Sequence, residues 1–298
     1  MEMLAMSHVA KRFGEKQVLR DVTFRVPEHT VFGFAGKNGA GKTTAMKLIL
    51  GLLASDSGEI LVNGMPVRYG NTETNRLVGY LPDVPEFYSY MTPREYLRFC
   101  GEIAGMASKD IRIRSEELLS LVGLANENYR IRGFSRGMKQ RLGIAQALFG
   151  RPKLLICDEP ASALDPAGRK ELLDILADAK EQTTVLFSTH ILSDAEHICD
   201  EVAFLHEGKI VLQGPVAKVR SMRKAAPMRL ELERPEDVQI LLSAFPRLTV
   251  VRRCMLMLEE CERLPDLLRF LADRRISILR MERGEASLED LFMEVVGK

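Results

Sequence analysis

The chain has 298 residues, of which 46% are hydrophobic and 28% are charged. This composition is typical of a folded globular protein and argues against long disordered segments. The 42 lysines and arginines nearly balance the 41 aspartates and glutamates. We therefore expect no nucleic-acid partner, because duplex-binding proteins usually carry a strong basic excess. At about 150 residues per domain, the length predicts roughly two domains.

Membrane-spanning and secreted classes are also disfavoured. No run approaches the roughly 18 consecutive apolar residues that span a bilayer, and the N-terminus lacks a secretory signal pattern. The cysteines include no CxxC pair, so neither a disulfide framework nor a cysteine zinc site is supported. They are Cys100, Cys157, Cys199, Cys254 and Cys261. We expect a cytoplasmic, mainly α/β protein.

The first 216 residues alternate between strand and helix patterns. A strand is predicted over residues 18–26, and an apolar strand over 31–35 leads through a glycine-rich loop into a helix over 44–53. The later predicted elements are a hairpin over 58–67 with an Asn63-Gly64 turn, helical structure over 92–124, a helix over 136–149, strands over 154–157, 184–188 and 201–205, and helices over 166–180 and 191–199. Such alternation favours a parallel sheet covered by helices.

The pattern changes after Gly214-Pro215. We predict a second, small α+β domain over residues 217–298, following a first domain over 1–216. Its predicted elements are a strand over 228–233, a helix over 235–244, strands over 248–251 and 255–259, a helix over 264–274, a strand over 276–281 and a helix over 288–296.

The loop between the strand at 31–35 and the following helix contains the pattern G-x-x-x-x-G-K-[ST], which is typical of a P-loop. Its glycines let successive backbone amides point at phosphate oxygens, and the helix adds its positive N-terminal end. Lys42 supplies charge for the β- and γ-phosphates, and the Thr43 hydroxyl is a ligand for Mg²⁺. The alternative is a glycine-rich turn with a solvated lysine. The predicted ATP-binding residues are Gly36, Lys37, Asn38, Gly39, Ala40, Gly41, Lys42, Thr43 and Thr44.

Two acids follow the apolar strand at 154–157. A P-loop ATPase needs a carboxylate at the end of a neighbouring buried strand, and Asp158 is predicted to hold the Mg²⁺ shell. Glu159 is predicted to orient and deprotonate the attacking water. In isolation, two acids after a strand are more often a helix N-cap, and the upstream P-loop is what favours the catalytic interpretation.

These residues and three further stretches resemble the nucleotide-binding subunits of ATP-binding cassette (ABC) transporters. Phe134–Leu142 resembles the family signature loop, Ser162–Asp165 the D-loop, and Ser188-Thr189-His190 the switch histidine. Ser287–Phe292 resembles the end of the appendage of export-type single-cassette subunits. The resemblance implies a P-loop NTPase core with a mixed sheet covered by helices, an antiparallel β edge and a helical subdomain at about 84–150.

The resemblance also implies a dimer of two copies that sandwich ATP. Ser135 and the backbone at Gly137 would bind the γ-phosphate held by the other copy, and His190 would contact it within its own copy. Asp165 would carry coupling across the interface. Phe13 stands where the family places an aromatic that stacks on adenine, although a lone phenylalanine at a strand end is more often a packing residue.

This sequence departs from the family pattern at three places. Asp83 aligns with the Q-loop glutamine, and its carboxylate could face Mg²⁺ through water. Arg136 replaces the first of two signature glycines, where it would add positive charge near the phosphate, and Met138 replaces the usual glutamine. Lys37 stands where proline is common. Because Glu159 is retained, we expect a site that hydrolyses ATP.

The function that the resemblance implies is the ATPase subunit of a transporter, with a separately encoded integral membrane permease and export as the direction. The protein would lie on the cytoplasmic face of the membrane. The aromatic segment at 84–91 would face the permease or simply pack onto the helical subdomain. One alternative is a soluble ABC ATPase that acts on DNA, the ribosome or an assembly scaffold. Another is a regulatory module that senses ATP without turnover. The tail would serve dimerisation, regulation or passive stabilisation.

Overall fold

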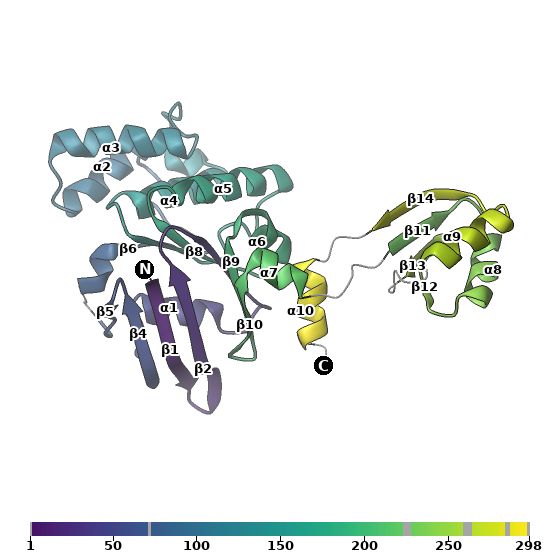
Figure 1. The fold of residues 1–298 in the computed structure, drawn as a ribbon. Coiled ribbons are helices and arrows are strands. Elements are labelled where there is room, and N and C mark those ends of the chain that lie inside the picture. The colour runs from purple at the N-terminus through teal and green to yellow at the C-terminus, as the bar shows by residue number, and fades with distance from the viewer. Residues whose placement is uncertain (1, 71–72, 223–227, 259–263, 284–286, 297–298) are drawn as a thin grey trace. The chain divides into compact units, whose positions relative to one another are not determined.

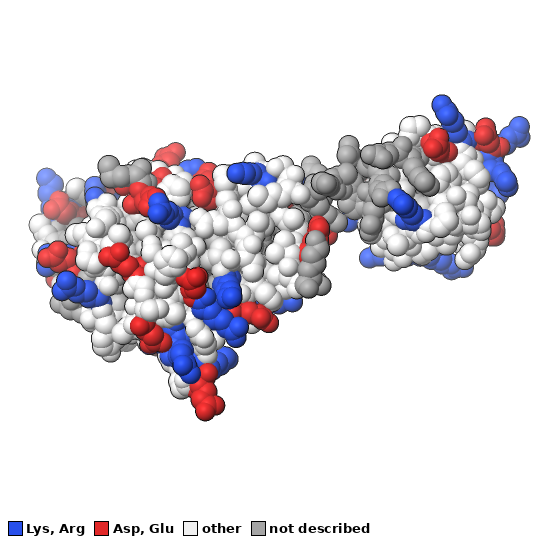
Figure 2. All heavy atoms as spheres, turned by 60° about the horizontal axis from the view of Figure 1, so that its bottom comes forward, with Lys and Arg blue, Asp and Glu red and all other residues white. Residues whose placement is uncertain are grey.

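The computed structural model describes residues 2–70, 73–222, 228–258, 264–283 and 287–296. The chain forms two compact units, Met1–Val216 and Ala217–Lys298. Figure 1 shows the course of the chain through both units. On the face drawn in Figure 2, lysines and arginines are interspersed with aspartates and glutamates over each unit.

The first unit is built on a six-stranded sheet with the order β10-β9-β3-β8-β7-β6. Its strands are β3 (Val31–Ala35), β6 (Val78–Leu81), β7 (Leu154–Cys157), β8 (Thr184–Thr189), β9 (Glu201–His206) and β10 (Lys209–Pro215). All neighbouring pairs are parallel except β9 and β10. Strands β3, β7 and β8 are buried along their whole length, which explains the continuous apolar sequences of β3 and β7 and the apolar centre of β8.

A second, antiparallel sheet has the order β2-β1-β4-β5. It consists of β1 (Glu2–Phe13), β2 (Lys16–Pro27), β4 (Ser57–Val62) and β5 (Met65–Pro66). The predicted Asn63-Gly64 turn joins β4 and β5 and has positive φ at both residues, as a two-residue hairpin requires. Strands β1, β6 and β10 have no counterpart among the predicted elements. Repeated register shifts interrupt the alternation of β1.

Two apolar cores cover the two faces of the parallel sheet. One contains Leu155, Cys157 and Phe187 with the residues of the helical segments, and the other contains Phe32, Ile156 and the antiparallel sheet. Figure 1 shows α4 (Arg136–Leu148) and α5 (Pro166–Ala179) on one side of the sheet and α1 (Lys42–Ile49) on the other. The shorter elements of the unit are α6 (Leu192–Ile198) and the 3₁₀ turns η1 (Glu73–Leu77) and η2 (Ile131–Gly133). Helix α7 (Val216–Ser221) begins at the last residue of the unit and continues into the second.

The helical segment predicted over 92–124 is two helices, α2 (Pro93–Ile103) and α3 (Ser108–Leu121). Gly105 separates them with a φ of 70°, a left-handed conformation that ends α2. In the same way, α1 ends before Gly51, which has a φ of 68°, and does not reach residue 53. The predicted capping box at Thr92 is present, since its hydroxyl accepts from the Glu95 amide and Glu95 accepts from the Thr92 amide.

From β11 to β14 the second unit has the chain order strand–helix–strand–strand–helix–strand, followed by helix α10, and its four strands form an antiparallel sheet with the order β12-β13-β11-β14. This is the split βαβ arrangement of ferredoxin-like domains. Its elements are β11 (Met228–Leu232), α8 (Glu236–Ala244), β12 (Leu248–Arg252), β13 (Met255–Leu258), α9 (Leu264–Asp273), β14 (Ile278–Arg283) and α10 (Leu288–Val296). The unit has its own apolar core, which includes Leu230, Leu241, Leu256 and Leu267.

Cys100, Cys157, Cys199 and Cys254 are free thiols, and burial raises the pKa of the Cys157 and Cys199 thiols. Cys261, and residue 259 at the end of one predicted strand, lie outside the described residues. Among the helices that the structure describes, none is long and apolar enough to serve as a membrane span.

We expect Thr92→Ala to lower the free energy of unfolding by about 1 kcal/mol, because the first turn of α2 loses its side-chain cap. Urea unfolding followed by circular dichroism measures this change. Thr92→Ser is the matched control, because it keeps the hydroxyl. Equal destabilisation by both substitutions would contradict the capping role.

Candidate functional site

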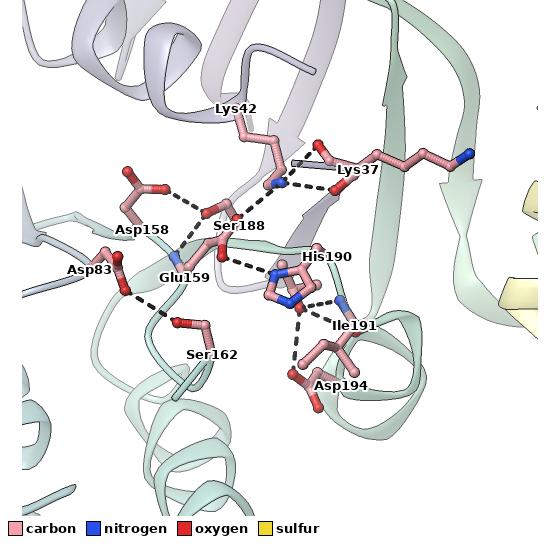
Figure 3. A network of polar contacts seen from close by, with 12 residues as sticks. Lys37, Lys42, Asp83, Asp158, Glu159, Ser162, Ser188, His190, Ile191 and Asp194 are labelled. Carbon is pink, nitrogen blue, oxygen red and sulfur yellow. Dashed lines mark hydrogen bonds and ion pairs between the residues drawn. The ribbon is translucent and has the colours of Figure 1, made fainter. Parts of the chain in front are cut away.

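The predicted catalytic residues follow adjacent parallel strands. In the sheet, β3 and β7 flank β8, so the carboxyl ends of all three strands lie at one edge. Lys42 follows β3 through the glycine-rich loop, Glu159 follows β7, and His190 follows β8. Figure 3 shows their side chains turned toward one another. This edge is where open parallel sheets bind ligands.

The glycine-rich loop depends on the conformations of its glycines. Gly39 and Gly41 have φ values of 80° and 113°, which residues with a Cβ atom rarely adopt. A Cβ atom at Gly36 would collide with the carbonyl oxygen of Leu205 on β9. Gly41 is the N-cap of α1, which has neither a side-chain cap nor an acidic residue in its first turn. The positive end of α1 is therefore not neutralised within its own helix.

The Lys42 side chain is 4% exposed, and its ammonium group has three close oxygen partners. It donates to the carbonyl oxygens of Gly36 at 2.8 Å and Lys37 at 3.2 Å, and its Nζ lies 3.1 Å from Oε1 of Glu159. An ammonium group has three hydrogens to donate. All three donors can thus be directed at the loop and at Glu159.

Glu159 connects the lysine to the histidine. Its Oε2 lies 2.9 Å from Nδ1 of His190, while Oε1 faces Lys42. The Glu159 backbone has a φ of 45°, in the left-handed region that a non-glycine residue adopts at a cost. Strained residues of this kind gather at functional sites. The carboxylate is therefore held between two cationic or donor groups at the edge of the sheet.

Ser188 is a residue of this site to which sequence reasoning assigned no role. It is fully buried, its hydroxyl donates to Oδ1 of Asp158 at 2.7 Å, and it accepts from the Glu159 amide at 2.8 Å. One hydroxyl thus fixes both acids that follow β7 (Figure 3). A polar residue directly after the apolar centre of a buried strand was the signal in the sequence, because buried hydroxyls require partners.

Tyr80 on β6 lies near the same acids. Burial, and then the negative charge of Asp158, raises the pKa of Tyr80 to about 12. The phenol therefore stays neutral at physiological pH and adds no negative charge beside Asp158.

A second polar network supports the segment around His190. Asp194 on α6 forms a bidentate ion pair with Arg169 on α5. The Arg169 Nε and Nη2 atoms donate to Oδ1 and Oδ2 of Asp194 at 2.7 and 3.0 Å. The Thr189 hydroxyl accepts from the Ile191 amide at 2.9 Å and lies 3.4 Å from Asp194. The backbone on both sides of His190 is thereby tied to two helices. Sequence reasoning gave Arg169 and Asp194 no role.

Three other predicted residues lie away from this cluster. The Ser135 hydroxyl accepts from the Met138 amide at 3.2 Å and so caps α4, which leaves its hydrogen free to donate. A Cβ atom at Gly137 would meet only ordinary contacts. Phe13 ends β1 with 47% of its surface exposed, and the Lys11 ammonium lies 5.5 Å from its ring centroid. Their predicted roles toward ATP are not tested by these contacts.

Asp83 follows β6 and faces other partners. Its Oδ1 accepts from the Ser162 hydroxyl at 3.2 Å and lies 3.7 Å from Nη2 of Arg136. Its carbonyl oxygen accepts from the Gln140 side chain at 2.5 Å. The role of Asp83 toward Mg²⁺ stays a prediction.

The donor set at the site fits a magnesium ion that is shared with a nucleotide. Thr43 is exposed at the start of α1, and Asp158 brings a carboxylate from the end of β7. Within the described part of the chain, no three His, Cys, Asp or Glu side chains form a metal cage. Magnesium commonly binds through one or two protein oxygens together with phosphates and waters.

The fold and the P-loop cluster define a nucleotide-hydrolysing cassette, and comparison with known proteins identifies its family. Residues 19–162 match the family described as ABC transporter. The uncharacterized ABC transporter ATP-binding protein YxlF of Bacillus subtilis (strain 168) is 36% identical over 99% of both chains. The bacitracin transport ATP-binding protein BcrA of Bacillus licheniformis is 32% identical over 99% of this chain and 97% of that protein.

Solved structures agree. A structure described as the ATP binding subunit of an ABC transporter is 33% identical and superposes with a TM-score of 0.66, covering 74% of this chain and 92% of that one. The chain belongs to the family of ABC transporter ATP-binding proteins, and the predicted α/β fold class is confirmed. It is a subunit that binds and hydrolyses ATP for a transport system.

We expect Ser188→Ala to lower the free energy of unfolding by about 1–3 kcal/mol, because the Asp158 carboxylate loses a buried partner. The kcat for ATP hydrolysis should fall about ten- to hundredfold as Glu159 loses its fixed backbone. Steady-state ATPase assays and urea unfolding measure the two effects. Ser193→Ala, on the exposed surface of α6, is the control. An unchanged kcat would limit Ser188 to a structural role.

Proposed function

We propose that two copies of this chain close around two ATP molecules, and that closure and reopening drive a separate membrane permease in export. The observation that carries the proposal is the Lys42–Glu159–His190 cluster at the glycine-rich loop. Similarity to BcrA along nearly the whole chain supports a transport role that includes the second unit. The lantibiotic transport ATP-binding protein SrtF of Streptococcus pyogenes, 38% identical over 71% of this chain and 90% of that protein, supports it further.

The contacts of Lys42 suggest how ATP would prepare the site. Its donors are directed at two carbonyl oxygens and Glu159, so a phosphate can bind the ammonium group only by replacing one of them. Glu159 is the only carboxylate among these partners, and it would be repelled by the incoming phosphate. Its displacement from Lys42 would free a carboxylate oxygen to take a proton from the attacking water. His190 would hold the other oxygen.

The charge that develops on the γ-phosphate needs donors fixed in position. The amides of the glycine-rich loop, Lys42 and the unneutralised N-terminus of α1 would supply them from one copy. The hydroxyl hydrogen of Ser135 and the backbone at Gly137, at the start of α4, would supply them from the other. Mg²⁺ bound at Thr43 and Asp158 would supply further positive charge. Phe13 would stack on adenine.

The permease would lie against the aromatic part of the helical subdomain. A hollow of about 650 Å³ is lined by residues that include Phe87, Tyr88, Tyr96 and Phe99. The ring of Phe87 packs edge-on against that of Tyr96 with 5.0 Å between the ring centroids, so part of the segment at 84–91 serves internal packing. Tyr88 is 49% exposed and Tyr90 is 61% exposed, which leaves apolar surface for a partner. The cassette would thereby sit on the cytoplasmic face of the membrane.

We expect Glu159→Gln to reduce ATP hydrolysis by about a hundredfold or more, because an amide cannot accept the proton from water. ATP binding should persist, and light scattering should detect a closed dimer that accumulates with ATP and Mg²⁺. Glu181→Gln, an exposed residue after α5, is the control and should behave as the wild type. Wild-type turnover in Glu159→Gln would show that Glu159 is not the base.

We expect Tyr88→Asp to abolish copurification with a membrane protein while ATP binding is kept, because a charge on the aromatic surface opposes burial against a partner. Tyr69→Asp, at a position that is 70% exposed elsewhere in the first unit, is the matched control. The readout is mass spectrometry of proteins that copurify from detergent-solubilised membranes. Recovery of ribosomes or DNA in place of a polytopic membrane protein would contradict the transporter role.

A further inference from the structure

We propose that Asp83 is a positioning residue that holds the N-terminus of α4 against the ends of β6 and β7, through an ion pair with Arg136. The proposal rests on the proposed function in one respect, because the N-cap of α4, Ser135, and its second residue, Gly137, are the signature residues predicted to bind the γ-phosphate. It gives Asp83 a mechanical role in place of the predicted role toward Mg²⁺.

The main chain of Asp83 is already fixed to α4. Gln140 is 2% exposed, and its side-chain amide donates to the Asp83 carbonyl oxygen at 2.5 Å. The segment that leaves β6 therefore cannot move far from the second turn of α4 without leaving a buried amide without its partner.

The carboxylate adds two contacts to different elements. Its Oδ1 accepts from Ser162, in the turn between β7 and α5, at 3.2 Å (Figure 3). The same oxygen lies 3.7 Å from the Arg136 guanidinium, at the first residue of α4. One side chain thus connects the segment after β6, the turn after β7 and the start of the signature helix.

Arg136 places a positive charge at the N-terminus of α4, where a negatively charged partner is favourable. A cation at a helix N-terminus is repelled by the positive end of the helix dipole, and α4 has no acidic residue in its first turn. Asp83 supplies the missing negative charge from outside the helix. Both positions depart from the family pattern, and the two departures carry opposite charges. Either departure alone would leave one charge without this partner.

The pair is half exposed, with 51% of the Arg136 and 50% of the Asp83 side chain accessible, so its coupling is modest. Exposed ion pairs of this kind change an equilibrium about two- to fivefold. That range suits a contact that would form and break during the proposed closure and reopening of the dimer.

Hydrogen exchange of the amides of residues 136–141 in the full-length chain tests the pair without requiring hydrolysis. Asp83→Asn and Arg136→Gln should each raise exchange about two- to fivefold, and the double variant should exchange no faster than the more affected single variant. The controls are Asp110→Asn, an exposed acid in the first turn of α3, and Arg132→Gln in η2.

ATPase assays separate this role from one at the metal. If Asp83 positions α4, Asp83→Asn and Arg136→Gln lower kcat to the same extent and leave the Mg²⁺ concentration for half-maximal activity unchanged. Two outcomes would overturn the proposal: additive effects of the two substitutions on exchange, or a raised Mg²⁺ requirement in Asp83→Asn alone. Failure of the proposed function would instead show as wild-type turnover in Glu159→Gln, whereas the exchange experiment would still decide the role of Asp83.

Discussion

The buried Lys42 ammonium group is the constraint on which the arrangement of the site depends. A cation that is 4% exposed must be matched by oxygen atoms, or burial would cost several kcal/mol. Two of these oxygens come from the loop that precedes the lysine, and the third comes from the acid that follows β7. These contacts link the segments that follow β3 and β7, whose ends the sheet already places at one edge. The buried charge therefore helps to define the geometry in which a phosphate can bind.

The surrounding fold makes this geometry rigid. Apolar cores cover both faces of the parallel sheet, so the strands that carry Lys42, Glu159 and His190 cannot shift independently. Buried polar residues then set the final orientation. Ser188 fixes the acids after β7, and the Arg169–Asp194 pair fixes the chain around His190. Packing places the loops, and a few hydrogen bonds direct the side chains.

Local sequence patterns were sufficient where one segment carries the whole signal. The glycine-rich loop, the apolar strands β3, β7 and β8 and the Thr92 capping box were predicted, because spacing and residue type determine them locally. Strand β1 was missed because register shifts disturb its alternation, and the break between α2 and α3 depends on the single residue Gly105. The contacts of Ser188 and Asp83 join residues 29 to 79 positions apart. No local pattern encodes such pairs.

The left-handed backbone at Glu159 lowers the free energy of unfolding, so the catalytic site is kept at a cost in stability. A glycine would adopt a φ of 45° at little cost, whereas a glutamate there loses on the order of 1–2 kcal/mol. Selection for thermal stability alone would thus tend to replace the very residue that is proposed to activate water. In a lineage where ATP hydrolysis is no longer selected, replacement of this glutamate would be expected among the early changes.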